Sequence, residues 1–291
     1  MGFVTANSVS IAVDTAGPDD GMPLLLIMGL AAQLTFWPDS MVDGLARAGF
    51  RVIRFDNRDI GHSRKFDEAG LPDLAGIAAG TARAPYTLAD MADDAAGVLD
   101  ALDIARAHVV GMSMGAAITQ ILAADHPARC RSATLIMGST HAPDLPAGTP
   151  EARAALMAQP DDPADREQVI RLGMAVRRAI GSPAYPMADD DAYEFYARQT
   201  DRGYHPQGIL RQAAATLASA DRRVLVARIA CPTLVLHGEA DPVRPVDHGR
   251  DLAARIPGAV LRTWPGMGHD LPEELVPEMV AAITDHARRA G

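Results

Sequence analysis

The sequence contains few cysteines. Only two, Cys130 and Cys231, occur among 291 residues, so a disulfide framework is excluded. No cysteine–histidine spacing is typical of a zinc site, and we expect no metal. Each cysteine precedes an apolar run that resembles a buried strand, which favours two inert thiols over a disulfide.

Long apolar runs and blocks of basic residues are also missing. The longest apolar run, around 24–28, is too short to cross a bilayer, and residues 1–6 do not resemble a signal peptide. We therefore expect no membrane insertion and a cytoplasmic protein. The net charge of −10, without Lys/Arg blocks, disfavours nucleic acid as a partner. The oligomeric state is left open.

Short apolar runs alternate with helical patterns along the chain. Most runs are apolar throughout and four to six residues long, which is typical of strands buried on both faces of a parallel sheet. The alternation predicts the α/β class, with a mainly parallel central sheet flanked by helices. The expected strands are Ser10–Val13, Pro23–Met28, Arg51–Phe55, His108–Gly111, Ala133–Met137, Thr233–His237 and Ala259–Trp264.

One long stretch interrupts the alternation. Residues 141–228 contain no convincing strand, many prolines, and helical periods at Arg166–Ile180, Asp190–Thr200 and Gln207–Ala220. We expect a helical insertion that caps the site, with residues 1–140 and 229–291 forming the core. Ordinary crossover helices are the alternative, but the stretch is longer than one crossover needs.

The strongest local motif is Gly111-Met112-Ser113-Met114-Gly115. It follows an apolar run and precedes a helical pattern, the strand–turn–helix context of a nucleophile elbow. Glycines flank the serine because side chains there would clash in so tight a turn. The motif predicts Ser113 as a nucleophile at the start of a helix, whose free N–H groups favour developing negative charge.

A serine nucleophile needs a base and an acid that orients it. His269 follows the last expected strand, and Asp241 follows the strand before it, so the chain order is Ser, Asp, His. The alternative placement of the acid after Ala133–Met137 offers no carboxylate before Asp144. We expect Ser113, Asp241 and His269 to form the catalytic triad.

Backbone N–H groups should stabilise the oxyanion. We expect these donors at Met114, directly after the nucleophile, and at Leu30, after the strand Pro23–Met28. The neighbouring Gly29, Trp37 and Met112 would then line an apolar substrate pocket; the alternative for such side chains is plain core. The polar run 56–63 is expected to be a hydrogen-bonded loop that braces the elbow.

Together these motifs resemble the α/β-hydrolase superfamily, and most closely bacterial carboxylesterases related to aclacinomycin methylesterase. The matching segments are Leu26-Ile27-Met28-Gly29-Leu30, Trp37-Pro38-Asp39, Arg54-Phe55-Asp56-Asn57-Arg58-Asp59, the elbow and Gly266-Met267-Gly268-His269. The resemblance implies the same triad and oxyanion donors, a helical cap and no cofactor. Many members have His-Gly where this chain has Met28-Gly29, and Asp-x-Arg-Gly where it has Arg58-Asp59. These departures weaken any inference of this chain's substrate from better-known branches of the superfamily.

The function predicted is hydrolysis of a small carboxylic ester, with short-chain acyl esters, methyl esters and lactones as substrate classes. Two alternatives on the same triad are cofactor-free haloperoxidase or perhydrolase chemistry and hydrolysis of a carbon–carbon bond. A ligand-binding receptor that retains the triad is a third. Epoxide hydrolases and haloalkane dehalogenases are disfavoured because they need an aspartate where this chain has Ser113.

Overall fold

The computed structural model describes residues 1–291, and its centre is one eight-stranded sheet. The strand order is β1-β2-β4-β3-β5-β6-β7-β8; β1–β2 and β2–β4 pair antiparallel, and every other pair is parallel. The α/β fold and mainly parallel sheet are therefore confirmed. The strands are β1 Gly2–Ala6, β2 Val9–Ala16, β3 Met22–Ile27, β4 Phe50–Phe55, β5 Ala107–Met112, β6 Cys130–Ile136, β7 Thr233–Gly238 and β8 Val260–Trp264.

All seven expected strands are present, and β1 is an additional strand that was not expected. This edge strand is largely exposed, so it lacks the continuous apolar run by which the buried strands were found. It forms a hairpin with β2 through Asn7 and Ser8, which both have positive φ. Two such residues match the right-handed twist of a tight hairpin.

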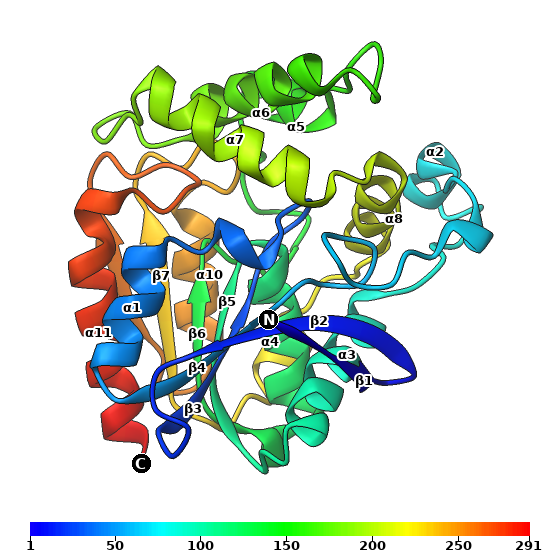
Figure 1. Ribbon diagram of the computed structural model, residues 1–291. Coiled ribbons are helices and arrows are strands. Elements are labelled where there is room, and N and C mark those ends of the chain that lie inside the picture. The colour runs from blue at the N-terminus through cyan, green and yellow to red at the C-terminus, as the bar shows by residue number, and fades with distance from the viewer.

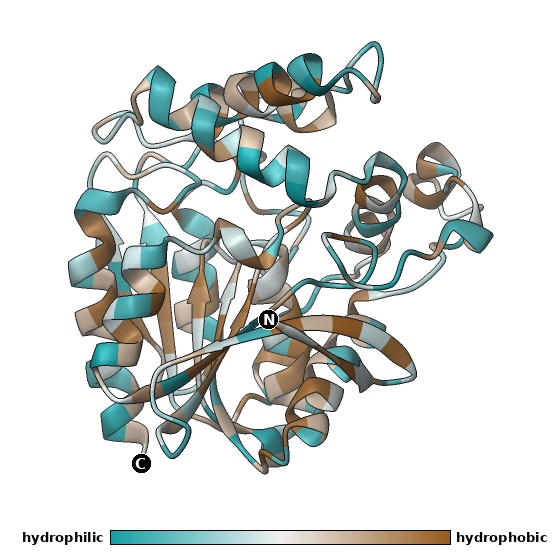
Figure 2. Ribbon diagram, viewed as in Figure 1, coloured by the Kyte–Doolittle hydropathy of each residue, from teal (hydrophilic) through white to brown (hydrophobic).

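Helices cover both faces of the sheet (Figure 1). Side chains of β3 alternate between two cores: Leu25 and Ile27 pack in the core of α3 and α4, whereas Leu24 and Leu26 pack in that of α1 and α11. Figure 2 shows the apolar strands inside and polar outer surfaces on the helices. The helices outside residues 141–228 are α1 Asp39–Arg47, α2 Leu74–Ala78, α3 Leu88–Ala101, α4 Met114–Asp125, α10 Asp247–Arg255 and α11 Val276–Ala290.

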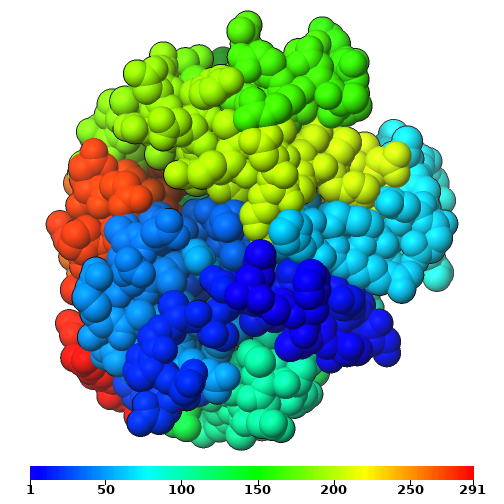
Figure 3. All heavy atoms as spheres, viewed as in Figure 1, coloured from blue at the N-terminus to red at the C-terminus, as the bar shows by residue number.

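Residues 141–228, the helical insertion, contain no strand. Its α5, α6 and α7 lie above the carboxyl ends of the parallel strands, and α8 lies beside α2 (Figure 1). In Figure 3 the insertion, green to yellow, lies directly against the cyan segment of the core. Its helices are α5 Pro150–Met157, α6 Arg166–Ile180, α7 Asp189–Gly203, α8 Pro206–Leu217 and α9 Arg223–Val226.

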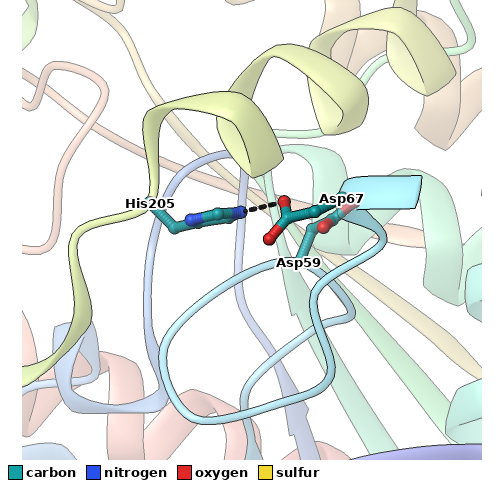
Figure 4. A group of neighbouring side chains, drawn as sticks. All are labelled: Asp59, Asp67 and His205. Atoms are coloured by element: carbon teal, nitrogen blue, oxygen red, sulfur yellow. Dashed lines mark hydrogen bonds and ion pairs between the residues drawn. The ribbon is translucent and has the colours of Figure 1, made fainter. Parts of the chain in front are cut away.

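An ion-pair cluster that is buried at one side and exposed at the other joins α8 to the core. Asp59, Asp67 and His205 converge there, with the His205 ring 2.9 Å from the Asp67 carboxylate (Figure 4). The guanidinium of Arg211 lies among them, 2.7 Å from Asp59 and 2.8 Å from Asp67. Arginine therefore supplies the positive charge that balances these carboxylates.

The two cysteines are free thiols, as expected. Burial raises the pKa of Cys130 to about 12, so this thiol is unreactive at neutral pH. No helix of the structure combines the length and apolar character needed to cross a membrane.

Candidate active site

The turn between β5 and α4 holds Ser113 in a strained conformation. Its φ of 55° and ψ of −115° lie in a region that side-chain-bearing residues rarely adopt. The neighbouring glycines permit the turn: a Cβ on Gly115 would lie 2.0 Å from the Ile27 carbonyl oxygen, and one on Gly111 would lie 2.2 Å from that of Gly115. The local sequence therefore allows the elbow that its motif predicts.

Ser113, His269 and Asp241 come together although they lie far apart in the sequence. The Ser113 hydroxyl donates to His269 Nε2 over 3.0 Å, and His269 Nδ1 donates to the Asp241 carboxylate over 2.7 Å. Burial alone would raise the pKa of Asp241, but the adjacent His269 outweighs it and the pKa lies below its ordinary value. Asp241 therefore stays ionised and holds the imidazole with Nε2 toward the Ser113 hydroxyl.

The loop after β7 holds Asp241 in place. The backbone N–H groups of Val243 and Arg244 each donate to Asp241 Oδ1 over 2.8 Å. His237 Nε2 donates to the Arg244 carbonyl over 2.7 Å and lies 3.5 Å from Asp241 Oδ2. Burial lowers the pKa of His237, so it supports this loop as a neutral side chain. From the sequence, His237 was expected only to end a strand.

The helical insertion contacts the loop that carries His269. The His269 N–H donates to the Ile180 carbonyl at the end of α6 over 2.8 Å. Ser182 accepts from the Gly268 N–H over 2.9 Å and donates to the Asp270 carboxylate, which also lies 3.2 Å from Arg177. No sequence pattern indicated these contacts, because they join residues about 90 positions apart.

The expected oxyanion donors belong to two segments that meet at Ser113. Gly29 packs against the elbow, where a Cβ would lie 3.2 Å from that of Ser113. The Leu30 N–H has no hydrogen-bond acceptor in the protein, and the Met114 N–H is at the first position of α4, outside the helical ladder. Both donors are thus available to a substrate oxygen.

The loop 56–63 differs from its expected role. Asn57 donates to the Met28 carbonyl over 2.9 Å, and Asp56 accepts from the Leu34 N–H over 2.8 Å. Asp56 also pairs with Arg202 of α7 at 2.8 Å. The loop therefore braces the oxyanion segment and the helical insertion rather than the elbow itself, because β4 lies next to β3 and one strand further from β5.

A cavity of about 510 Å³ lies between the sheet and the helical insertion, and Ser113 and His269 line it. Trp37 is only 1% exposed and belongs mainly to the core, although it reaches the cavity wall. The other expected pocket residues that line this cavity are Gly29, Leu30, Met112 and Met114. Aromatic and aliphatic side chains of α6 and α7 line its opposite wall, including Val176, Phe195 and Tyr196. Such a cavity suits a small, largely apolar molecule.

The family model described as the alpha/beta hydrolase fold matches residues 22–274, and the chain belongs to this family. It is 32% identical to a rhodomycin D methylesterase of Streptomyces sp. (strain C5) and 31% identical to one of Streptomyces peucetius, in both cases over 99% of this chain and 98% of the relative. An enol-lactonase from Burkholderia xenovorans LB400 superposes with a TM-score of 0.74 at 23% identity, covering 99% of this chain and 100% of that one. The structural likeness supports the fold, and the resemblance to this superfamily is confirmed.

Proposed function

We propose that the protein is a serine carboxylic ester hydrolase that acts on small esters through an acyl-enzyme. The hydrogen-bonded chain Ser113–His269–Asp241, which opens into a largely apolar cavity, is the observation that carries this proposal. The two rhodomycin D methylesterases, matched along almost their whole length, favour methyl esters within this class. No resident cofactor is needed for the chemistry described next.

Catalysis begins when the Ser113 hydroxyl attacks the ester carbonyl and His269 takes its proton. The N–H groups of Leu30 and Met114 stabilise the oxyanion of the tetrahedral intermediate. His269 then donates the proton to the departing alcohol, and the acyl group remains on Ser113. Water, deprotonated by His269, attacks the acyl carbonyl, and His269 returns the proton to the Ser113 oxygen as the acid leaves. Asp241 stays ionised throughout and stabilises the imidazolium.

The helical insertion, residues 141–228, is assigned the role of a cap over a core formed by residues 1–140 and 229–291. Helices α6 and α7 contribute one wall of the cavity, while the core contributes the triad. Because the cap supplies much of the surface that a bound ester would touch, it selects the substrate. The enzyme is assigned to the cytoplasm, where the free thiols Cys130 and Cys231 stay reduced.

The test is hydrolysis of p-nitrophenyl acetate, butyrate, octanoate and palmitate by the wild type and by Ser113→Ala. The variant should lose at least about 1000-fold in kcat/KM, because the covalent route is removed. The exposed Ser10→Ala is the matched control and should keep full activity. Circular dichroism should show the same fold in all three proteins. Equal slow rates in the wild type and Ser113→Ala would reject Ser113 as the nucleophile.

A further inference from the structure

One wall of the catalytic cavity carries an arginine without a partner. Arg244 lies three residues after Asp241, and its backbone is fixed by hydrogen bonds to Asp241 and His237. Its side chain lines both the catalytic cavity and a smaller adjoining cavity. The guanidinium makes no hydrogen bond or ion pair in the protein, and burial lowers its pKa. Arg244 is only partly exposed. A partly desolvated charge without a partner is unfavourable, so the position favours a ligand of opposite charge.

A second arginine lies in the same wall. Arg222 is 7% exposed and lines the cavity, and its guanidinium donates to the Gln120 amide oxygen, the Ser139 carbonyl and the Ser219 hydroxyl. All three acceptors are neutral. Burial and the nearby charge of Arg244 lower the pKa of Arg222 to about 10, so it remains a cation at neutral pH.

The carboxylates nearest to this wall are already paired. Asp241 accepts from His269 and from two backbone N–H groups. Asp221, which lines the smaller cavity, lies 2.6 Å from Arg223. Asp241 attracts Arg244 and Asp221 attracts Arg222, but neither carboxylate forms an ion pair with these arginines. The wall therefore carries two positive charges without an ion-pair partner, in a protein whose net charge is −10.

We propose that Arg244, supported by Arg222, binds a carboxylate of the substrate, so that the preferred esters also carry a free acid group. The planar guanidinium matches a carboxylate in shape and charge, and a partly desolvated pair of this kind contributes strongly to recognition. This inference rests on the proposed ester hydrolysis and specifies its substrate class: half-esters of dicarboxylic acids and related anionic esters.

The experiment compares monomethyl esters of dicarboxylic acids, from succinate to sebacate, with the corresponding dimethyl esters. The wild type should prefer a half-ester over its neutral diester in kcat/KM. In Arg244→Gln this preference should fall about tenfold or more, chiefly through KM, because a charged hydrogen bond is lost. Arg198→Gln removes the same charge from an exposed arginine of α7 that also reaches the cavity, and should keep the preference.

A wild type that hydrolyses diesters but never prefers a half-ester would overturn the carboxylate site and leave ester hydrolysis standing. Equal losses in Arg244→Gln and Arg198→Gln would also overturn it, because general electrostatic attraction would then explain the preference. Calorimetric titration with adipate and suberate gives a readout without catalysis. If the wild type binds these dicarboxylates and Arg244→Gln binds them about tenfold more weakly, the carboxylate site is supported even if no ester tested is hydrolysed. If the wild type does not bind them, the result counts against the site.

Discussion

The backbone N–H of His269 donates to the carbonyl oxygen of Ile180, the last residue of α6, at 2.8 Å. The position of the proposed base therefore depends directly on the helical insertion. Ser182 strengthens this connection, because its hydroxyl joins the Gly268 N–H to the Asp270 carboxylate. Movement of α6 away from the core would break these bonds and displace the imidazole from Ser113.

Ser182→Ala should lower kcat about fivefold with a smaller change in KM, because a net hydrogen bond of about 1 kcal/mol corresponds to a loss of this size. The variant leaves the Gly268 N–H without its acceptor and Asp270 without one of its donors, so the loop that carries His269 is held less firmly. Steady-state kinetics with p-nitrophenyl butyrate would measure it, with Ser10→Ala as control. An unchanged kcat would show that the other contacts of the loop suffice.

Arg211→Met should destabilise the protein by about 3–5 kcal/mol, because it leaves the fully buried Asp59 without its main partner. Arg166→Met is the matched control: its ion pair with Asp201 is exposed to solvent, so its loss should change stability far less. Urea unfolding of the two variants provides the comparison. Similar losses would mean that the Asp59–Arg211 pair contributes little more than a surface contact.

Stability should fall in mild acid because of His108. Burial lowers its pKa to about 4, whereas an unfolded histidine titrates near 6.5. Between these values the unfolded chain binds a proton that the folded protein does not, so stability decreases as the pH falls through this window. From pH 7 to pH 5 the loss from this one residue should be about 2 kcal/mol.

His108→Asn should remove that loss, since an amide can keep the hydrogen bond to Ser132 without titrating. The free energy of unfolding at pH 7 and pH 5 provides the measurement. The exposed His126→Asn serves as control and should leave most of the acid sensitivity in place. If His108→Asn loses as much stability between pH 7 and pH 5 as the wild type, other buried histidines cause the acid sensitivity.

Local sequence carried enough information to predict the sheet and the elbow. Parallel strands such as β5 are buried on both faces and therefore appear as continuous apolar runs, and Gly111 and Gly115 are required by close backbone contacts that leave no space for a Cβ. The positions of Ser113, Asp241 and His269 after successive strands were enough to predict that their side chains lie together, as the hydrogen bonds among them show.

Features that depend on contacts between distant segments were not predictable in this way. The exposed β1 has no apolar run, and the bonds of Ile180 and Ser182 to the histidine loop follow from how α6 lies on the core. Arg244 lies in no distinctive sequence pattern. It was singled out because its guanidinium forms no ion pair within a partly buried environment, and only the three-dimensional structure shows this. The catalytic roles of the triad residues stay predictions until the variants are measured.

Polar side chains of the helical insertion also hold the segment that carries Leu30, the proposed oxyanion donor. Gln212 of α8 accepts from the Ala31 N–H at 3.1 Å, and Arg202 of α7 donates to Gln33. In protein-engineering terms, the unit that can be exchanged between relatives is therefore larger than residues 141–228. A transplanted insertion would have to bring matching partners for Ala31 and Gln33, or it would alter substrate choice and turnover together.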